Sequence, residues 1–245
     1  MVASRSFAAS MDRGASPCAL APSRMPKAVM APHEALVHIP AGRVQLEGQL
    51  VIPAGATGLV AFAHGSGSSR HSPRNQLVAG VLHARGIASL LFDLLTREED
   101  VEYGTRFDIT LLTRRLTTVS GWLMKQPETK ALNLGFFGAS TGAAAALQAA
   151  GALGDKVKAV VSRGGRPDLA GEQALGTVRS PTLLIVGGND HSVIDLNEEA
   201  YAQLTCTKHL QIIPGATHLF EEPGTLAAAA SAAADWFVRY LTSVE

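Results

Sequence analysis

The chain has 245 residues, enough for one large α/β domain or two small ones, and its 21 basic and 21 acidic side chains give a formal net charge of zero. This balance removes the electrostatic basis for binding nucleic acid or an acidic membrane, and no apolar stretch is long enough to span a bilayer, so we expect no nucleic-acid or membrane partner. Cys18 and Cys206 are the only cysteines, which excludes a disulfide framework or a cysteine-rich metal site and favours a reducing, cytoplasmic location.

The start of the chain differs in composition from the rest. It is rich in Ser, Ala, Pro and Arg and shows neither a helical nor a strand period. An organelle transit peptide has this composition, and so does a disordered extension or a start site assigned too early. Because Pro17, Pro22 and Pro26 would interrupt an amphipathic helix, we favour a disordered extension over residues 1–33, followed by one domain over residues 34–245.

After the extension, strand-like apolar runs alternate with helical patterns. Residues 34–39 and 44–52 predict a pair of antiparallel strands at a sheet edge. Further strands are expected at 58–65, 87–95, 133–139, 157–165, 182–190 and from 208. Helices are expected at 75–86, with Leu77, Val81 and Leu82 inward, and at 109–126, from 141, at 195–205 and at 226–241. This alternation predicts an α/β fold, a mainly parallel sheet of about eight strands with helices on both faces.

A serine between two glycines stands where a predicted strand gives way to a predicted helix. Residues 138–142 fit the pattern G-x-S-x-G, which requires this strand-to-helix context. A backbone that lifts Ser140 clear of the sheet must turn within one residue. Neighbours two positions away then collide unless they lack a β-carbon, as Gly138 and Gly142 do. The pattern predicts Ser140 as a nucleophile; the alternative is a glycine-flanked turn with an idle serine.

A serine nucleophile needs a base, and the base needs a carboxylate that fixes its tautomer. Among the eight histidines, His218 is the one expected in a loop just after the last strand. Asp190 ends the preceding predicted strand, so Ser140, Asp190 and His218 follow the chain order of an α/β-hydrolase triad. Asp168 is the second candidate for the acid, and Asp195 is expected to cap the next helix.

An acyl-transfer site also needs hydrogen-bond donors for the oxyanion. We expect one from the N–H of Thr141 and the other from the loop after the third strand, where we favour the N–H of Ser66. His64 is expected to brace this loop, and His64 and Gly67 are further candidates for contact with substrate. A phosphate-binding loop is the competing interpretation, although the patterns G-x-x-x-x-G-K-[ST] and G-x-G-x-x-G are both absent.

With these features the chain resembles the α/β-hydrolase superfamily, and more closely its dienelactone-hydrolase-like branch. The resemblance covers residues 34–241 and rests on "AHGSGSSRHSPRN", "GFFGASTGAAAAL", "LLIVGGNDHSV" and "PGATHLFEEPG". It implies the α/β-hydrolase fold and hydrolysis of an ester, thioester or lactone with neither metal nor cofactor. Dienelactone hydrolases proper carry cysteine at the nucleophile, where this chain has Ser140, so we expect a serine carboxylesterase for a small ester. Hydrolases of this branch are also found fused to, or encoded beside, phosphoribosyltransferases.

The pocket depends on two insertions and one arginine. Residues 163–180 leave room for a short helix but for no large cap between the sixth and seventh strands. The polar stretch at residues 95–108 is either a small lid or a solvated connection. Arg163 follows a strand end and is expected to hold a substrate carboxylate; the alternative is an ion pair with Glu98 or Asp168.

Two other function classes use the same fold. A hydrolase-fold acyltransferase needs the same triad and differs in excluding water, and a ligand-binding receptor can retain a triad. Labelling with a fluorophosphonate tests for a reactive serine, and hydrolysis with and without alcohol acceptors separates an esterase from a transferase. The sequence leaves open the acyl and alcohol groups and whether the protein forms a homo-oligomer.

Overall fold

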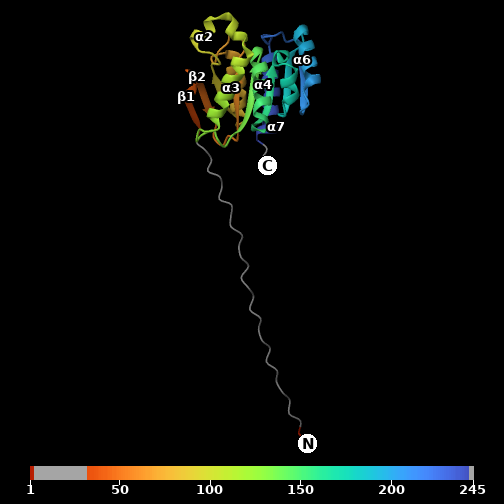
Figure 1. Ribbon diagram of the computed structural model, residues 1–245. Coiled ribbons are helices and arrows are strands. Elements are labelled where there is room, and N and C mark those ends of the chain that lie inside the picture. Colours follow the sequence, from red (N-terminus) through yellow and green to blue (C-terminus); the bar gives the residue numbers. More distant parts are fainter. Residues whose placement is uncertain (3–31, 243–245) are drawn as a thin grey trace.

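The computed structural model describes residues 1–2 and 32–242 (Figure 1). The predicted extension over residues 1–33 therefore lies outside the described residues apart from its two ends. No helix in the described part of the chain combines the length and apolar character needed to cross a membrane.

Eight strands form one sheet in the order β1-β2-β4-β3-β5-β6-β7-β8. They are β1 (His33–Ala41), β2 (Val44–Ile52), β3 (Gly58–Ala63), β4 (Ala88–Phe92), β5 (Asn133–Ala139), β6 (Val157–Arg163), β7 (Thr182–Gly187) and β8 (Lys208–Ile213). β2 pairs antiparallel with β1 at the edge and with β4, and the other neighbouring strands are parallel. The predicted eight-stranded, mainly parallel sheet with an antiparallel edge pair is confirmed.

Helices cover both faces of the sheet. On one face α1 (Pro73–Ala84) packs against α7 (Thr225–Leu241); on the other, α3 (Ile109–Leu123) packs against α4 (Thr141–Leu153), with α6 (His191–Gln203) beyond (Figure 1). Shorter pieces are α2 (Arg97–Val101), α5 (Glu172–Thr177) and the 3-10 turns η1 (Tyr103–Phe107), η2 (Gly154–Lys156) and η3 (Pro167–Ala170). Only η3 and α5 lie between β6 and β7, so the fold carries no large cap there.

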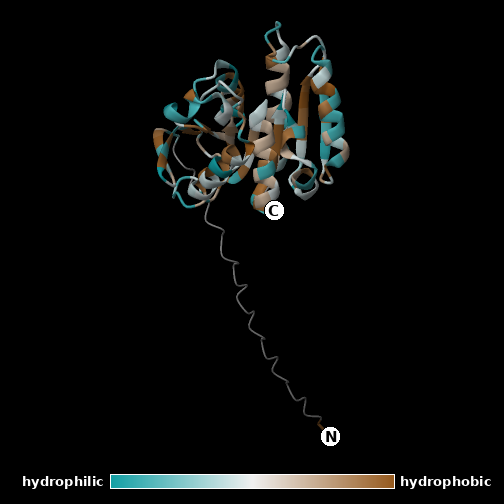
Figure 2. Ribbon diagram, turned by 45° about the horizontal axis from the view of Figure 1, so that its top comes forward, coloured by the Kyte–Doolittle hydropathy of each residue, from teal (hydrophilic) through white to brown (hydrophobic). Residues whose placement is uncertain are grey.

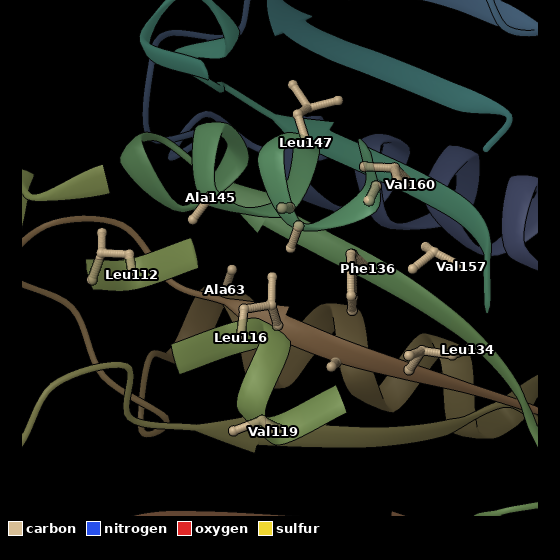
Figure 3. Close-up of a cluster of buried hydrophobic side chains, with 14 of the residues drawn as sticks. Ala63, Leu112, Leu116, Val119, Leu134, Phe136, Ala145, Leu147, Val157 and Val160 are labelled. Atoms are coloured by element: carbon tan, nitrogen blue, oxygen red, sulfur yellow. The ribbon is translucent and has the colours of Figure 1, made fainter. Parts of the chain in front are cut away.

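Successive residues of the central strands point into two separate cores. In β3, Ala61 and Ala63 face the core under α3 and α4, whereas Val60 and Phe62 face the core under α1 and α7. Figure 3 shows the first core, to which α3 contributes Leu116 and β5 contributes Phe136. Figure 2 shows the strands largely in brown, with teal residues on the outer helices. A strand buried on both faces reads as a continuous apolar run, which is why these strands could be predicted.

Two helices differ in detail from the prediction. α6 begins at His191, with Asp190 at its N-cap position, so Asp195 lies inside the helix and does not cap it. The earlier start is favoured because Val193 and Ala200 are both buried along one helical face. In α1 the predicted inward Leu77 is 41% exposed. The buried face of α1 follows a different helical register, formed by Asn75, Val78, Ala79 and Leu82.

Candidate active site

Ser140 occupies a sharp turn between β5 and α4. Its φ of 50° and ψ of −124° lie in a region that residues with a side chain rarely adopt. A β-carbon on Gly142 would lie 2.1 Å from the carbonyl oxygen of Ala63, and one on Gly138 would lie 2.4 Å from the Cα of Ala143. Both glycines are therefore required sterically, as the sequence pattern predicts, and the turn exposes the serine at the carboxyl end of the sheet.

Backbone hydrogen bonds hold this turn from the following segments. The N–H groups of Ala143 and Arg166 both donate to the carbonyl oxygen of Ser140, at 3.1 Å each. Gly65 approaches from the loop after β3, where a β-carbon would lie 2.9 Å from the Cβ of Ser140. The strained residue is thus fixed by α4, by the segment after β6 and by the loop after β3.

His218 lies in the loop after β8 and contacts Asp190, which follows β7. The Nδ1 of His218 is 2.7 Å from Oδ2 of Asp190, and these side chains are 39% and 14% exposed. A carboxylate at this distance accepts the Nδ1–H and leaves Nε2 as the free base. Asp168, the second candidate for the acid, instead forms a two-point ion pair with Arg166, at 2.7 and 2.9 Å.

Ser140 and His218 line one cavity of about 260 Å³. In the part of the chain that the structure describes, no hydrogen bond joins the Ser140 hydroxyl to His218. Such contacts are often loose in enzymes without substrate and tighten in the complex. The arrangement brings Ser140, His218 and Asp190, the predicted nucleophile, base and acid, to one edge of the sheet.

The loop after β3 is tied to both β4 and α4. The Leu94 N–H donates to Nε2 of His64 at 3.0 Å, so His64 carries its proton on Nδ1 and donates it to the carbonyl oxygen of Gly65, also at 3.0 Å. Burial lowers the pKa of His64, which keeps the ring neutral. The Ser66 N–H donates to Oγ1 of Thr141 at 3.0 Å, so the two residues expected to supply the oxyanion donors are in contact.

Of the three expected substrate contacts, Arg163 alone lines the cavity that holds Ser140. His64 is 7% exposed and lies behind the loop. Gly67, with a φ of 67°, points toward Arg106, whose Nη1 would lie 3.7 Å from an added β-carbon. None of residues 95–108 lines this cavity either; they form α2 and η1 beside the loop.

The cavity also contains polar residues that sequence reasoning missed. Ser68, Ser72, Arg74 and Asn75 line it from the end of the loop and the first turn of α1. Their position in the sequence could have indicated them, because they continue the loop that supplies Ser66 and lead directly into a helix N-terminus. Their direction relative to Arg163 depends on how α1 packs, which the sequence pattern does not specify.

Comparison with known proteins agrees with this fold. The chain matches the family model of the Dienelactone hydrolase family over residues 85–243. The crystal structure of a dienelactone hydrolase from Anabaena variabilis is 57% identical, and the match covers 86% of this chain and 99% of that one with a TM-score of 0.83. Est1E from Butyrivibrio proteoclasticus shares the fold at 16% identity, with coverage of 83% and 98% and a TM-score of 0.72.

Two curated relatives come from strains of Mycobacterium tuberculosis, and both are named as phosphoribosyl transferases. Each is 57% identical to this chain over 205 residues. The match covers 84% of this chain but 46% of the relative, so the chain spans less than half the length of the curated relatives it matches.

Proposed function

The chain belongs to the dienelactone hydrolase family, and from that premise we propose that it is a serine hydrolase that cleaves a small carboxylic ester. The observation that carries the proposal is the constellation at the sheet edge. Ser140, at a φ of 50°, shares a cavity with His218, and the Nδ1 of His218 lies 2.7 Å from Asp190. This arrangement supports the proposal, because acyl transfer by a serine needs a base near the hydroxyl and a carboxylate that orients the base.

In the first half of the reaction, Oγ of Ser140 attacks the ester carbonyl carbon while its proton passes to Nε2 of His218. Asp190 stabilises the imidazolium that forms. The carbonyl oxygen becomes an oxyanion, which the N–H groups of Thr141 and Ser66 stabilise. To do so, the Ser66 N–H gives up its hydrogen bond to the Thr141 hydroxyl and donates to the oxyanion instead. When the carbon–oxygen bond breaks, the alcohol leaves with the proton from His218 and the acyl group remains on Ser140.

In the second half, water repeats these steps. Its proton passes to His218, its oxygen attacks the acyl carbon, and the bond to Ser140 breaks as the serine oxygen takes the proton back. The carboxylic acid is released and the enzyme returns to its starting state. If an alcohol replaces this water, the same residues perform acyl transfer, and a lactone or thioester carbonyl reacts by the same steps.

The relatives' name suggests a second activity, phosphoribosyl transfer. We propose that this activity belongs to the part of those relatives outside the match. This assignment is supported by the 46% coverage and by the hydrolase fold of the matched part. A reducing, cytoplasmic location is also a proposal, supported by Cys206, which is a free thiol in the described part of the chain.

Replacing the nucleophile tests the proposed function. Ser140→Ala should abolish turnover of p-nitrophenyl acetate and covalent labelling by a fluorophosphonate, and His218→Ala should reduce turnover comparably because the two residues act as a unit. Ser231→Ala, an exposed serine of α7, is the matched control and should retain both. A Ser140→Ala protein that still hydrolyses the ester would refute the nucleophile assignment, and addition of alcohols would show whether transfer competes with hydrolysis.

A further inference from the structure

The cavity beside Ser140 is positively charged. Its polar lining besides Ser140 and His218 consists of Ser66, Ser68, Ser72, Arg74, Asn75 and Arg163, and no carboxylate is among its lining residues. An esterase for neutral esters has no need of two cations there. The two arginines therefore require an explanation beyond ester hydrolysis itself.

Arg163 is the buried member of the pair. It ends β6 directly beside Ala139 of β5, the residue before the nucleophile, and it is 5% exposed. Its Nε is buried without a hydrogen-bond partner. Nη2 reaches Oδ1 of Asn75 only at 3.5 Å, and the guanidinium lies 5.5 Å from the centre of the Phe220 ring. Within residues 32–242 no carboxylate pairs with Arg163. A buried cation without a counter-ion is costly unless a ligand supplies the charge.

Arg74 adds a second positive charge to the same wall. Its Nη1 is 3.5 Å from Oε1 of Glu221, and these side chains are 35% and 66% exposed, so solvent weakens the pairing. Burial, together with the charge of Arg74, lowers the pKa of Arg163 to about 10, which leaves Arg163 protonated at neutral pH. Both arginines are thus charged, and Arg163 is uncompensated.

The N-terminus of α1 lies at the same wall. Ser72 is the N-cap and its hydroxyl accepts a hydrogen bond from the Asn75 N–H at 3.4 Å; the helix continues for 12 residues. Pro73 at the first helical position has no N–H, and the Asn75 N–H is bound by Ser72, so this helix end contributes chiefly a partial positive charge, which favours an anion. The helix end and Arg163, whose Nε has no hydrogen-bond partner and which has no counter-ion within residues 32–242, point to the same kind of ligand.

We propose that this wall binds a phosphate monoester group carried by the substrate, with Arg163 and Arg74 as its charged contacts and Ser68 and Ser72 as hydroxyl donors. The inference rests on the proposed function and names its substrate class: a small ester that also bears a phosphate. Arg163 alone would favour a carboxylate, but a carboxylate neutralises only one of the two positive charges. A phosphate monoester carries a charge of about −1.5 to −2 at pH 7 and three acceptor oxygens, which match two guanidiniums and a helix N-terminus. The phosphate stays intact while the ester carbonyl reacts at Ser140.

The test compares three p-nitrophenyl esters: of phosphoglycolic acid, of succinic acid and of methoxyacetic acid, which carry a phosphate, a carboxylate and no charge. After correction for their rates of hydrolysis by hydroxide, the kcat/KM of the wild-type protein should be about tenfold or more higher for the phosphate ester than for the other two.

Arg163→Gln and Arg74→Gln should each lower kcat/KM for the phosphate ester by about 10- to 100-fold, as expected for lost charge-assisted hydrogen bonds. Turnover of the neutral ester should fall much less, so that the preference for the phosphate ester is lost, and Arg163→Lys should restore part of that preference. Arg179→Gln is the matched control and should change nothing, because its side chain is 74% exposed and precedes β7, at the end of the parallel strands opposite to this wall.

Several outcomes would overturn the inference. Equal losses on all three esters in both variants would assign the arginines to positioning the His218 loop, which Arg163 contacts through Phe220. A preference for the succinate ester would make the ligand a carboxylate. If the wild-type protein hydrolyses none of the esters, the proposed function fails, and calorimetry with inorganic phosphate then decides this inference alone. Phosphate binding that weakens in Arg163→Gln would support the subsite, and no binding to the wild-type protein would refute it.

Discussion

Asp190 and Asp168 each follow a strand of the sheet, yet they have different partners. Asp190 contacts His218 at 2.7 Å, and Asp168 holds Arg166 through both carboxylate oxygens. The two aspartates therefore offer a matched pair of substitutions that removes a charge at nearly the same place in the fold.

We predict that Asp190→Asn lowers kcat for p-nitrophenyl acetate by about 10⁴-fold. The same change causes this loss in a serine-protease triad, because asparagine favours the wrong tautomer of the histidine. Asp168→Asn should change kcat by less than about tenfold, since it removes a surface ion pair. Steady-state kinetics of both variants decides the matter. If Asp168→Asn has the larger effect, the acid is misassigned.

At Gly142 the packing leaves room for a hydrogen atom but not for a β-carbon. A β-carbon there would lie 2.1 Å from the Ala63 carbonyl oxygen, whereas one on Gly80, exposed on α1, would meet nothing within 4 Å. We predict that Gly142→Ala strongly destabilises the protein or shifts the nucleophile turn enough to remove activity. Gly80→Ala should raise the free energy of unfolding by about 0.5–1 kcal/mol, because alanine favours the helix. Urea titrations of the two variants test this, and a Gly142→Ala protein with normal stability and turnover would contradict it.

Among the elements, the loop after β3 is the one that joins the most parts of the site. It connects β3 to α1, supplies Ser66, and is held to the end of β4 by His64 and to α4 by Thr141. Its geometry, and with it the expected oxyanion donors, thus depends on a neutral, buried imidazole.

The pH dependence of stability follows from the lowered pKa of His64. In the unfolded chain His64 becomes protonated near the ordinary histidine pKa of about 6.5. In the folded protein burial lowers this pKa, so His64 becomes protonated only at a lower pH. The unfolded state therefore binds more protons as pH falls below about 6.5, and the free energy of unfolding decreases there, by at most about 1.4 kcal/mol per pH unit for one group. Above that pH the contribution of His64 is fully present.

We predict that His64→Asn is less stable than the wild-type protein at pH 8 and has a shallower dependence of stability on pH between 5 and 7. Some slope should remain, because burial also lowers the pKa of His83. Urea titrations at four pH values, with exposed His38→Asn as the control, measure both effects. An unchanged slope in His64→Asn would show that the ring does not govern this dependence.

For the whole molecule, the absence of a large cap decides how much of a substrate can be buried. Between β6 and β7 stand only η3 and α5, and the cavity at Ser140 measures about 260 Å³, at the small end for ligand sites. Ala139 and Leu219 are the apolar side chains among its lining residues, so little apolar surface is available to a long acyl chain.

We predict a preference for short acyl groups. Each buried methylene contributes only about 0.8 kcal/mol, and a chain that leaves the cavity gains nothing further. Across p-nitrophenyl esters from acetate to laurate, kcat/KM should therefore stop rising before an acyl group of about eight carbons. A continued increase beyond that length would reveal an apolar channel outside the described cavity.

The features that depend on neighbours along the chain could be predicted before the fold was known. Continuous apolar runs predicted the buried strands, and the alternation of strands with helices predicted the parallel sheet. The two glycines around Ser140 predicted the strained turn, because the collision they avoid is set by covalent geometry within a few residues. The helix boundaries at Asp195 and the inward face assigned through Leu77 were wrong, because helical register is decided by what the helix packs against.

Only the tertiary structure decided which distant residues meet. Chain order proposed both Asp190 and Asp168 for the acid, and it is the path of the loop after β8 that brings His218 to Asp190. Likewise Arg163 and Asn75 are 88 positions apart, and their contact requires α1 to lie on the face where its first turn reaches the end of β6. Such contacts depend on strand order and helix packing together, so the positively charged wall beside Ser140 cannot be recognised in any short stretch of sequence.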